Sequence, residues 1–549
     1  MSGGWRLKPR LATHDPRLAQ WYHHPALRLC ARVGEEQNVG RQPAKTLMIQ
    51  GTASDVGKSI LVAGLCRLLR QDGYHVAPFK AQNMALNAAV TIDGGEIGRS
   101  QATQARAARI EPTVEMNPIL LKPEAGMRSQ VIVRGKVWRT LPWREYYTHR
   151  AALLNTIAGS LNSLRDAYDI VLIEGAGSPA EINLKAGDIV NMRIAALADA
   201  PVLLVGDIDR GGVFASLLGT LELLEPDERA RVRGLLINKF RGDVSLLTPG
   251  LEMITARTGV PVLGVIPHLP RIGLAEEDSV ALDRRPDPTA QDDESDPLID
   301  IAVIRLTQIS NFDDFDPLAA EEGVRVRFVR DPARLGTPDL LIIPGTKSTI
   351  ADLAALRDAG LDCAIIALAR GGTPTIGICG GFQILGETIA DPFGVESDEA
   401  ATVGFGLLPL HTVFARIKTT DRASGTVSAD HGLLAGARGL PATGYEIHMG
   451  QTVGALPAAL RLNERQGVAV DEPDGAISAD GLILGTYMHG FFDSAPLRGT
   501  ILTNLARRKG ITPRAWGHTA APNDDPFDRL AAHLREHLDL PRIYAEMGL

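Results

Sequence analysis

Residues 46–59 read TLMIQGTASDVGKS, and this stretch decides the fold of the first half of the chain. Its opening residues form a short buried-strand pattern, and a loop bounded by two glycines then leads into a helical pattern over 60–71. Such a loop turns several backbone N–H groups toward one anion, and the helix N-terminus adds partial positive charge. The lysine would neutralise phosphate and the last serine would bind Mg²⁺. The stretch therefore predicts an ATP site formed by Gly51, Thr52, Asp55, Gly57, Lys58 and Ser59.

Strand and helix patterns alternate outward from this loop. Helical spacing of apolar residues recurs at 151–165, between strand patterns that lie at 46–50, 75–79, 169–174, 201–206, 233–238 and 262–266. A second series of strand patterns lies at 299–305, 324–329, 339–343, 374–378 and 482–486. Strands that alternate with helices favour a parallel sheet covered on both faces. We therefore expect an α/β protein with two doubly wound, mainly parallel-sheet domains.

The domain boundaries follow from composition. Residues 284–297, RRPDPTAQDDESDP, are polar, acidic and rich in proline, which predicts a linker between domains at 45–283 and 298–510. Residues 1–44 are basic and poor in acidic residues, as in an organelle transit peptide, but we expect a disordered extension. Residues 511–549 predict a helical tail, in which Pro541 would end or kink the helix.

Composition excludes several classes of protein. With 45% hydrophobic and 22% charged residues, the chain can build cores and is not disordered throughout. A net charge of −8 disfavours binding to nucleic acid, and no apolar run approaches the length of a membrane span. Four cysteines in 549 residues do not make a disulfide framework. We expect a cytoplasmic protein with no nucleic-acid or membrane partner, and the oligomeric state stays open.

A carboxylate at a strand end supports the nucleotide site. The strand at 169–174 ends in Glu174, which a glycine turn follows. The carboxyl ends of parallel strands are where α/β sheets bind ligands. Alone, this residue would more often be a solvated strand end, but beside the phosphate loop it predicts a Mg²⁺ ligand together with Ser59.

A second site is indicated by GICGGFQ, residues 377–383. This G-x-C-x-G pattern after a strand is typical of a nucleophile elbow, where small neighbours permit a strained turn and the helix N-terminus favours the thiolate of Cys379. By contrast, Cys66 and Cys363 lie in apolar helical patterns and are expected to be buried structural residues. A cysteine nucleophile needs a base. We expect His489, at the end of the strand 482–486, to supply it.

Backbone groups near this cysteine could stabilise an oxyanion. Residues 344–347, PGTK, follow a strand. Their N–H groups, at Gly345 and Thr346, would form an oxyanion hole with Gly380 beside the nucleophile.

The first half resembles the dethiobiotin synthetase-like branch of P-loop proteins, in which a substrate carboxylate is phosphorylated. The resemblance rests on the five-residue spacing between the loop glycines, on Lys80 and on the Glu174-Gly-Ala-Gly turn. It implies that Lys80 contacts phosphate or the substrate carboxylate and that Asn238 lies where the branch reads the nucleobase. Thr52 occupies the position where a sister branch of ATPases carries a second signature lysine, which argues against that branch.

The second half resembles class I glutamine amidotransferases. The resemblance implies that Cys379 attacks the carboxamide of L-glutamine, that His489 shuttles the proton and that Gln383 helps to hold the substrate. One position departs from the pattern: Phe491 stands where the family carries a glutamate two residues after the histidine. Glu446 or His448 are candidates to compensate.

Nearly the whole chain resembles the cobyric acid synthase family, most densely at 50–55, 79–87, 181–192, 207–214 and 444–450. Members use ATP and glutamine to amidate the b, d, e and g carboxylates of adenosylcobyrinic acid a,c-diamide, a corrinoid of cobalamin biosynthesis. The residues alone predict only an amide ligase; the conversion of a carboxylate to an acyl phosphate and the internal delivery of ammonia are what the two domain resemblances imply. Candidates to orient the substrate or the acyl phosphate are Lys80, Asn83, Asn183, Asp188, Asp207 and Arg210.

Alternative interpretations exist for the candidate site residues and for the function. The stretch with Asn183 and Asp188 could be a solvated loop, and Asp207 with Arg210 could be a structural ion pair. A sister enzyme that amidates the a and c carboxylates is the nearest rival function. A non-catalytic P-loop scaffold with an inactive glutaminase domain is the rival from another class, and the departure at Phe491 is its best support.

Overall fold

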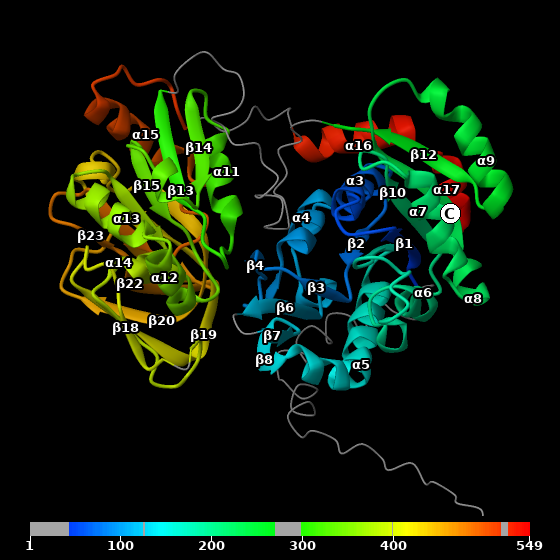
Figure 1. Ribbon diagram of the computed structural model, residues 1–549, viewed down its shortest axis with the longest axis horizontal. Helices are drawn as coiled ribbons and strands as arrows, with labels where there is room; N and C mark the ends of the chain where they lie inside the picture. Colours follow the sequence, from blue (N-terminus) through cyan, green and yellow to red (C-terminus); the bar gives the residue numbers. More distant parts are fainter. Residues whose placement is uncertain (1–42, 125–126, 270–297, 398, 518–524) are drawn as a thin grey trace, which may run out of the picture. The chain divides into compact units, whose positions relative to one another are not determined.

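The computed structural model describes residues 43–124, 127–269, 298–397, 399–517 and 525–549 (Figure 1). The extension predicted at 1–44, apart from its last two residues, and the linker predicted at 284–297 lie outside these ranges. Residues from Ala44 to Leu549 belong to one compact unit. Among the described residues, no helix combines the length and the apolar character that crossing a membrane requires.

The first half forms the expected parallel sheet, in the order β12-β11-β10-β1-β9-β2. Its strands are β1 (Lys45–Gly51), β2 (Val76–Phe79), β9 (Ile170–Glu174), β10 (Val202–Asp207), β11 (Val232–Phe240) and β12 (Val262–Pro267). Every neighbouring pair runs parallel. In this register Ile49 lies opposite Glu174, and Gly51 lies opposite Val205. The phosphate loop and the acidic strand end therefore meet at one edge of the sheet.

Helices pack apolar faces onto this sheet. The longer ones are α3 (Lys58–Gln71), α4 (Arg99–Ala107), α5 (Trp143–Ala167), α7 (Val213–Glu222) and α9 (Thr248–Thr258), with α6 (Met192–Ala198) and α8 (Pro226–Arg229) shorter. Residues such as Leu65 and Leu68 of α3 share a core with Leu47 and Ile49 of β1. The phosphate loop thus opens directly onto a helix that is fixed by the core.

Between β2 and α5 the chain forms short strands that the sequence patterns did not predict. A four-stranded sheet has the order β3-β6-β7-β8, and β4 pairs with β5. These strands are β3 (Gln82–Met84), β4 (Ala88–Val90), β5 (Glu96–Gly98), β6 (Ile119–Glu124), β7 (Arg128–Val133) and β8 (Lys136–Pro142). Several are only three residues long, too short for a periodic pattern to mark them.

The second half forms another mainly parallel sheet, in the order β14-β13-β15-β16-β24-β23. Only the edge strand β23 runs antiparallel to its neighbour. The strands are β13 (Ile299–Ile304), β14 (Val324–Val329), β15 (Leu340–Ile343), β16 (Thr375–Ile378), β23 (Ala476–Ile477) and β24 (Ile483–Thr486). The helices are α11 (Asp316–Ala319), α12 (Thr349–Asp358), α13 (Leu361–Arg370), α14 (Gly380–Leu385) and α15 (Ala495–Lys509). Two mainly parallel α/β domains are therefore confirmed.

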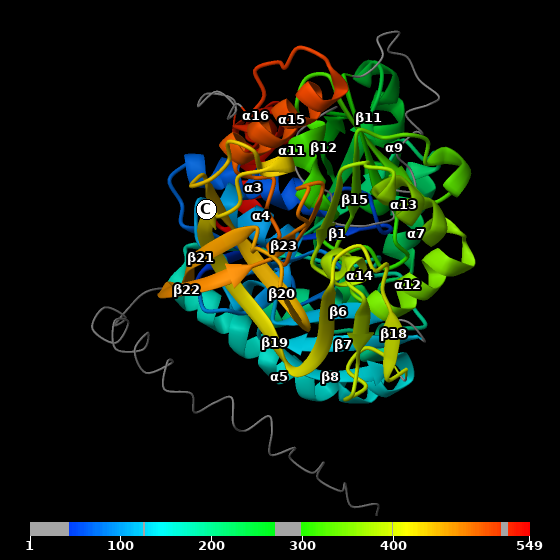
Figure 2. The same cartoon turned by 90° about the vertical axis from the view of Figure 1, so that its left-hand side faces the viewer.

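A mostly antiparallel sheet is inserted into the second half, between α14 and β23 (Figure 2). It follows the order β18-β17-β19-β21-β22, and β20 pairs with β19. The strands are β17 (Thr388–Ala390), β18 (Ala401–Val403), β19 (Leu410–Val427), β20 (Pro441–Gly454), β21 (Leu460–Arg465) and β22 (Val468–Asp474). The helix α14 that follows the elbow is short: it ends at Leu385, and β17 begins three residues later.

The chain's last two helices, α16 (Pro526–His537) and α17 (Leu540–Met547), return to the first sheet. Leu530 and Leu534 share a core with α3, and Gly64 of α3 allows the close approach, since a Cβ there would lie 2.4 Å from Leu534 Cδ1. The helix α16 ends before Pro541, which lies in the first turn of α17. The helical tail is thus part of the core beneath the phosphate loop.

Replacing Leu534 with alanine tests this packing. Because the side chain is fully buried, L534A is expected to lower the free energy of unfolding by about 2–5 kcal/mol, measured by urea denaturation. Glu536→Ala, exposed on the same helix, is the control and should change stability by less than about 0.5 kcal/mol. Equal stability of the two variants would show that α16 is not part of the core.

Candidate functional site

The phosphate loop joins β1 to α3 through two residues in the left-handed region, Asp55 with φ 58° and Gly57 with φ 98°. The ammonium of Lys58 folds back over the loop. Its Nζ donates to Ala53 O at 2.9 Å and to Gly177 O at 3.1 Å. This places a cation across the concave side of the loop, where phosphate oxygens would be bound.

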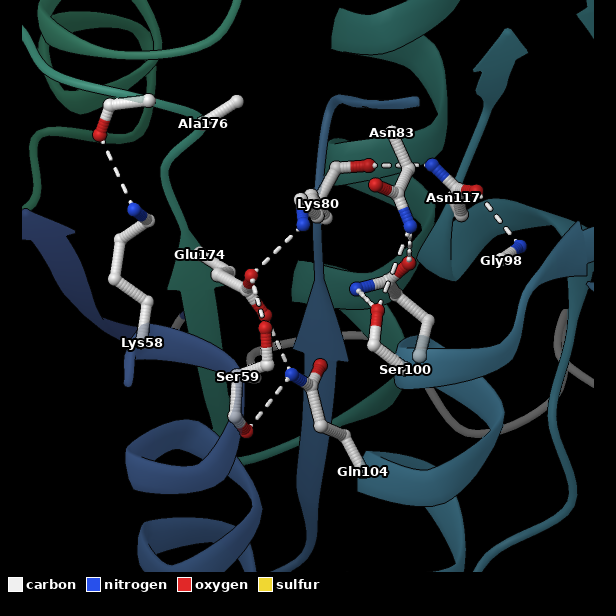
Figure 3. A network of polar contacts seen from close by, with 12 residues as sticks. Lys58, Ser59, Lys80, Asn83, Gly98, Ser100, Gln104, Asn117, Glu174 and Ala176 are labelled. Carbon is white, nitrogen blue, oxygen red and sulfur yellow. Dashed lines mark hydrogen bonds and ion pairs between the residues drawn. The ribbon is translucent and has the colours of Figure 1, made fainter. Parts of the chain in front are cut away.

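Glu174 is the centre of the polar network at this edge (Figure 3). Only 1% of it is exposed, and its carboxylate accepts hydrogen bonds from three elements. The donors are Ser59 Oγ at 2.8 Å, Lys80 Nζ at 2.8 Å and Gln104 Nε2 at 2.5 Å. A hydroxyl oxygen beside a carboxylate is the donor set that Mg²⁺ prefers, so Ser59 and Glu174 fit the cation. Sequence reasoning missed Gln104, because no motif surrounds it.

Asn238 fixes the loop from the neighbouring strand. Its Nδ2 donates to Val56 O at 2.8 Å, and a Cβ on Gly57 would lie 2.3 Å from Asn238 Nδ2. Glycine is therefore required at position 57 by both space and backbone conformation. In this structure the Asn238 amide is engaged with the loop.

Asp207 and Arg210 belong to an ion network beside the loop. The carboxylate of Asp207 accepts from Lys239 Nζ at 2.8 Å and lies 3.7 Å from Arg210 Nε. Arg210 also lies 3.4 Å from Asp55, and Lys239 donates to Asp55 O at 2.6 Å. These contacts match the ion-pair alternative and bind the loop to the ends of β10 and β11.

The remaining substrate candidates separate into three environments. Asn83 is buried and donates to Gln101 Oε1 at 3.1 Å, close to the Glu174 network. The carboxylate of Asp188 accepts from the backbone N–H groups of residues 190, 191 and 193 at 2.8–3.1 Å, which secures the start of α6. Asn183 is exposed. Burial and contacts thus bring Asn83 to the site more directly than the other two.

The second site is built on a strained turn. Cys379 lies between β16 and α14 with φ 52° and ψ −109°, and it is buried. A Cβ on Gly381 would lie 1.9 Å from Ile343 O, so only glycine fits there. The geometry is that of the expected nucleophile elbow.

The other described cysteines differ from this one. Burial raises the pKa of the Cys66 thiol, with the Glu174 carboxylate adding to the shift, so this thiol is inert. Cys363 was expected to be buried, and this prediction is wrong: the residue is exposed on α13. The apolar pattern around it extends past the face that packs on the sheet.

His489 follows β24 and is fixed by an acid that sequence reasoning missed. Its Nδ1 lies 2.7 Å from Asp314 Oδ2, and the other oxygen of Asp314 accepts from Gly490 N at 2.9 Å. Burial alone would lower the pKa of His489, but the Asp314 carboxylate and the neighbouring Cys379 raise it to about 10. Asp314 therefore holds the imidazole through Nδ1 and leaves Nε2 for proton transfer.

Asp314 lies beside His489 Nδ1, where a third acid of the site is expected. It lies in a short 3-10 helix, Phe312–Phe315, after β13, whereas Phe491 is packed in the core. The two compensating candidates have other partners: Glu446 pairs with Arg465 at 2.8 Å, and the His448 ring stacks on Tyr487. The expectation that Glu446 or His448 compensates for the missing glutamate is therefore wrong. Since Asp314 is 175 positions from His489 and next to another aspartate, its sequence carries no signal of this role.

The groups expected to bind glutamine surround one pocket. Thr346, Cys379, Gly380 and Gln383 line it, together with Lys122 and Gln130 from the first half of the chain. Gln383 is held in place, since its Oε1 accepts from Thr349 Oγ1 at 2.9 Å and its Nε2 donates to Tyr487 OH at 3.3 Å. Gly345 lies against the imidazole, since a Cβ there would lie 2.9 Å from His489 Cε1. The sequence-predicted residues of this site are thus brought together.

Comparisons with known proteins agree with this division. A family described as the CobQ/CobB/MinD/ParA nucleotide binding domain matches residues 47–281, and the CobB/CobQ-like glutamine amidotransferase domain matches residues 300–497. A cobyric acid synthase of Dehalococcoides mccartyi (strain CBDB1) is 55% identical over 504 residues, covering 91% of this chain and 98% of that protein. The cobyric acid synthase of Sorangium cellulosum is 54% identical over 523 residues, covering 92% and 99%. That of Yersinia enterocolitica is 50% identical over 504 residues, covering 91% and 97%.

Replacing Asp314 with asparagine tests the third member of the site. D314N keeps the shape but no longer stabilises the imidazolium or its tautomer, so glutamine hydrolysis should fall by at least about 100-fold. Release of glutamate measures the rate. Glu446→Gln is the matched control and should stay within about threefold of the unaltered chain, because Glu446 pairs with Arg465 and Asp314 is the acid beside His489. The reverse order of the two variants would identify Glu446 as the third acid.

Proposed function

Because the chain belongs to the cobyric acid synthase family, we propose that it amidates the b, d, e and g carboxylates of adenosylcobyrinic acid a,c-diamide with ATP and glutamine. Family membership makes it a glutamine-dependent amidotransferase ligase of cobalamin biosynthesis, with a corrinoid substrate. The observation that carries the proposal is the presence in one chain of a P-loop network around Glu174 and a Cys379–His489–Asp314 set. In this proposal ATP activates the substrate carboxylate, and glutamine supplies the nitrogen of the amide.

In the first step of the proposal, a substrate carboxylate oxygen attacks the γ-phosphorus of ATP, and ADP leaves with the electrons of the broken P–O bond. Lys58 and the loop N–H groups bind the phosphates. Ser59 and Glu174 would hold Mg²⁺, which would supply charge neutralisation at the phosphates. Lys80, buried and paired with Glu174, would neutralise the incoming carboxylate. The product is an acyl phosphate.

In the second step, Cys379 Sγ attacks the glutamine carboxamide and His489 takes the thiol proton. The N–H groups of Gly345, Thr346 and Gly380 are proposed to stabilise the oxyanion. His489 then protonates the leaving nitrogen, which departs as ammonia, and water hydrolyses the thioester to glutamate. Asp314 keeps the imidazole oriented throughout.

The two steps join when ammonia attacks the acyl carbon and phosphate leaves, so that an amide remains. Delivery inside the protein protects ammonia from protonation, and we propose an internal channel for it. We place the enzyme in the cytoplasm, where thiols such as Cys379 stay reduced. The scheme involves no nucleic acid and no membrane.

Counting the amides added distinguishes this function from that of the sister enzyme. The purified protein, given ATP, Mg²⁺, glutamine and the a,c-diamide, is expected to add four amides, as measured by mass spectrometry. Cobyrinic acid, without amides at a and c, is the control substrate and should gain none at those positions. No amide gained on the a,c-diamide would contradict the proposal.

Replacing Cys379 with alanine separates the two sites. C379A removes the nucleophile, so amidation with glutamine should be lost, while amidation with added ammonium salt continues at a comparable rate. Cys363→Ala is the matched control and should keep both activities, since this cysteine is exposed on α13. If the unaltered chain hydrolyses no glutamine, the scaffold function is favoured instead.

A further inference from the structure

The pocket beside Cys379 is lined by charged groups that the proposed chemistry does not use. Its lining includes the ionisable side chains of Lys122, Lys347, Glu396 and Lys418. Attack on the carboxamide and proton transfer are assigned to Cys379, His489 and Asp314, so these steps leave the other charges without a role. Removing charged groups from water costs free energy, and a cluster of them in a pocket is typical of a site for a charged ligand.

The lysines at one end of the pocket outnumber the carboxylate that holds them. Glu96 accepts from Lys122 Nζ at 2.7 Å through Oε1 and from Lys418 Nζ through Oε2. These three side chains are at most 10% exposed, and two ammonium groups with one carboxylate leave a net positive charge. Burial lowers the pKa of Lys418 to about 8, helped by the charges of Lys122 and Lys347 and opposed by Glu96. An anion at this end would complete the pairing.

This cationic group of Glu96, Lys122 and Lys418 lies where two parts of the chain meet. Glu96 in β5 and Lys122 in β6 belong to the part that matches the nucleotide-binding family, whereas Lys418 lies in β19 of the glutaminase half. Gln130 of β7 also accepts from Lys418 Nζ, at 3.2 Å. The cationic group is therefore complete only when both halves are present.

Glu396 supplies a carboxylate to the same pocket. One of its oxygens accepts from the backbone N–H of Thr349 at 2.8 Å. Burial raises the pKa of Glu396 to about 7, and the ammonium that opposes this shift, that of Lys347, is paired with Glu124 at 2.6 Å. A cation brought by a ligand would therefore stabilise the ionised form of Glu396.

The backbone around Glu396 is fixed by Asp391. The carboxylate of Asp391 accepts from the backbone N–H groups of residues 395, 396 and 397 at 2.8–3.0 Å. The position of Glu396 is thus set before a ligand binds, which reduces the entropy that binding would cost.

L-Glutamine has the groups that match this lining. Its α-carboxylate is an anion, its α-ammonium group is a cation, and two methylene groups join them to the carboxamide. The pocket offers the cationic group, the carboxylate of Glu396 and the apolar side chains of Phe414, Ile447 and Met449, beside the thiol of Cys379. The neutral carboxamide alone would use neither charge.

We propose that Lys122 and Lys418 bind the α-carboxylate of L-glutamine and that Glu396 binds its α-ammonium group. This inference rests on the proposed function, from which glutamine is taken as the nitrogen donor. It assigns part of the glutamine site to the synthetase half, since Lys122 and its partner Glu96 come from there. The glutaminase half by itself would lack one of the two lysines.

The expected consequence is a preference for free L-glutamine over other amides. A glutamine side chain within a peptide lacks both charges, because its α-groups form peptide bonds. Each contact between charged groups is expected to favour the substrate by about 10–100-fold in kcat/KM. The pocket would therefore protect neutral amides and glutamine residues of other proteins from hydrolysis.

The test compares L-glutamine with two amides that each lack one charge. Glutaramate has no α-ammonium group, and 4-aminobutanamide has no α-carboxylate. Hydrolysis by the full chain is followed as the carboxylic acid formed, without the corrinoid. The unaltered enzyme should lose about 10–100-fold in kcat/KM with each analogue.

Two variants connect each charge to its residue. Glu396→Gln should lower kcat/KM for L-glutamine by about 10–100-fold, mainly through KM, but change the value for glutaramate by less than about threefold. Lys122→Met should do the same for L-glutamine and spare 4-aminobutanamide. Lys122→Arg keeps the charge and should restore part of the activity with L-glutamine.

Matched controls lie close to both positions. Glu399→Gln changes an exposed glutamate of the same loop, and Lys136→Met changes an exposed lysine of β8, in the same small sheet as Lys122. Both should keep the activities of the unaltered enzyme on all three amides. Amidation with added ammonium should stay within about twofold in every variant, because it needs no bound glutamine.

The outcomes are distinguishable. An equal loss on all three amides in Glu396→Gln or Lys122→Met would overturn the assignment, because the residue would then support the pocket and not one charge of the substrate. Equal hydrolysis of the three amides by the unaltered enzyme would overturn it as well. If Lys122→Met does not fold, Lys418→Met decides in the same way, since it removes the other lysine on Glu96.

A binding measurement covers the case in which the unaltered enzyme hydrolyses none of the amides. Calorimetric titration of the Cys379→Ala chain should then show L-glutamine binding at least about 10-fold more tightly than either analogue, and equal affinities would overturn the proposal. Failure of the proposed function is separate. Absence of added amides on the a,c-diamide would contradict that function, whereas hydrolysis and binding of the three amides need no corrinoid.

Discussion

The burial of the Glu174 carboxylate is the constraint on which the first site depends. A carboxylate removed from water is stable only when its oxygens are hydrogen-bonded or paired. Ser59, Lys80 and Gln104 meet this need from three separate elements, so the phosphate loop, the end of β2 and α4 are held at one point. The residues that satisfy the carboxylate are also the ones expected to respond when a cation replaces one of them.

At the second site, too, a buried carboxylate is stabilised by a polar partner. His489 and Asp314 are both buried, and each compensates for the loss of water around the other. The strained turn at Cys379 persists because glycines on either side remove the clashes that side chains would cause. Cys379 and His489 both follow strands of the parallel sheet, β16 and β24. Rigid strands thus position the chemistry, and the inserted sheet adds Tyr445 and Ile447 around it.

Local patterns account for what the sequence predicts well. Each strand of the two main parallel sheets, the loop with Lys58, the elbow with Cys379 and the strand end with His489 is marked by a short run of consecutive residues. Asp314 and Gln104 are different, because their contacts with the sites join residues 175 and 70 positions apart. The antiparallel pairing of β19 with β20 depends on contacts between the two strands, which the hydrophobic pattern of either strand alone does not predict. Asp188 secures the start of α6 through a local contact that its polar surroundings did not predict, and its role in binding the substrate stays a prediction.

The return of α16 and α17 to the first sheet affects the order in which the two halves can fold during synthesis. A ribosome makes the phosphate loop before the glutaminase half, yet the core beneath α3 is closed by Leu530, Leu534 and Ile543, which are synthesised after the glutaminase half. The nucleotide-binding half therefore finishes folding only after the whole glutaminase has been made. A chain interrupted in translation would expose an apolar face of α3 and be a target for proteolysis. The topology thereby makes the stability of the nucleotide-binding half depend on residues that follow the glutaminase half in the chain.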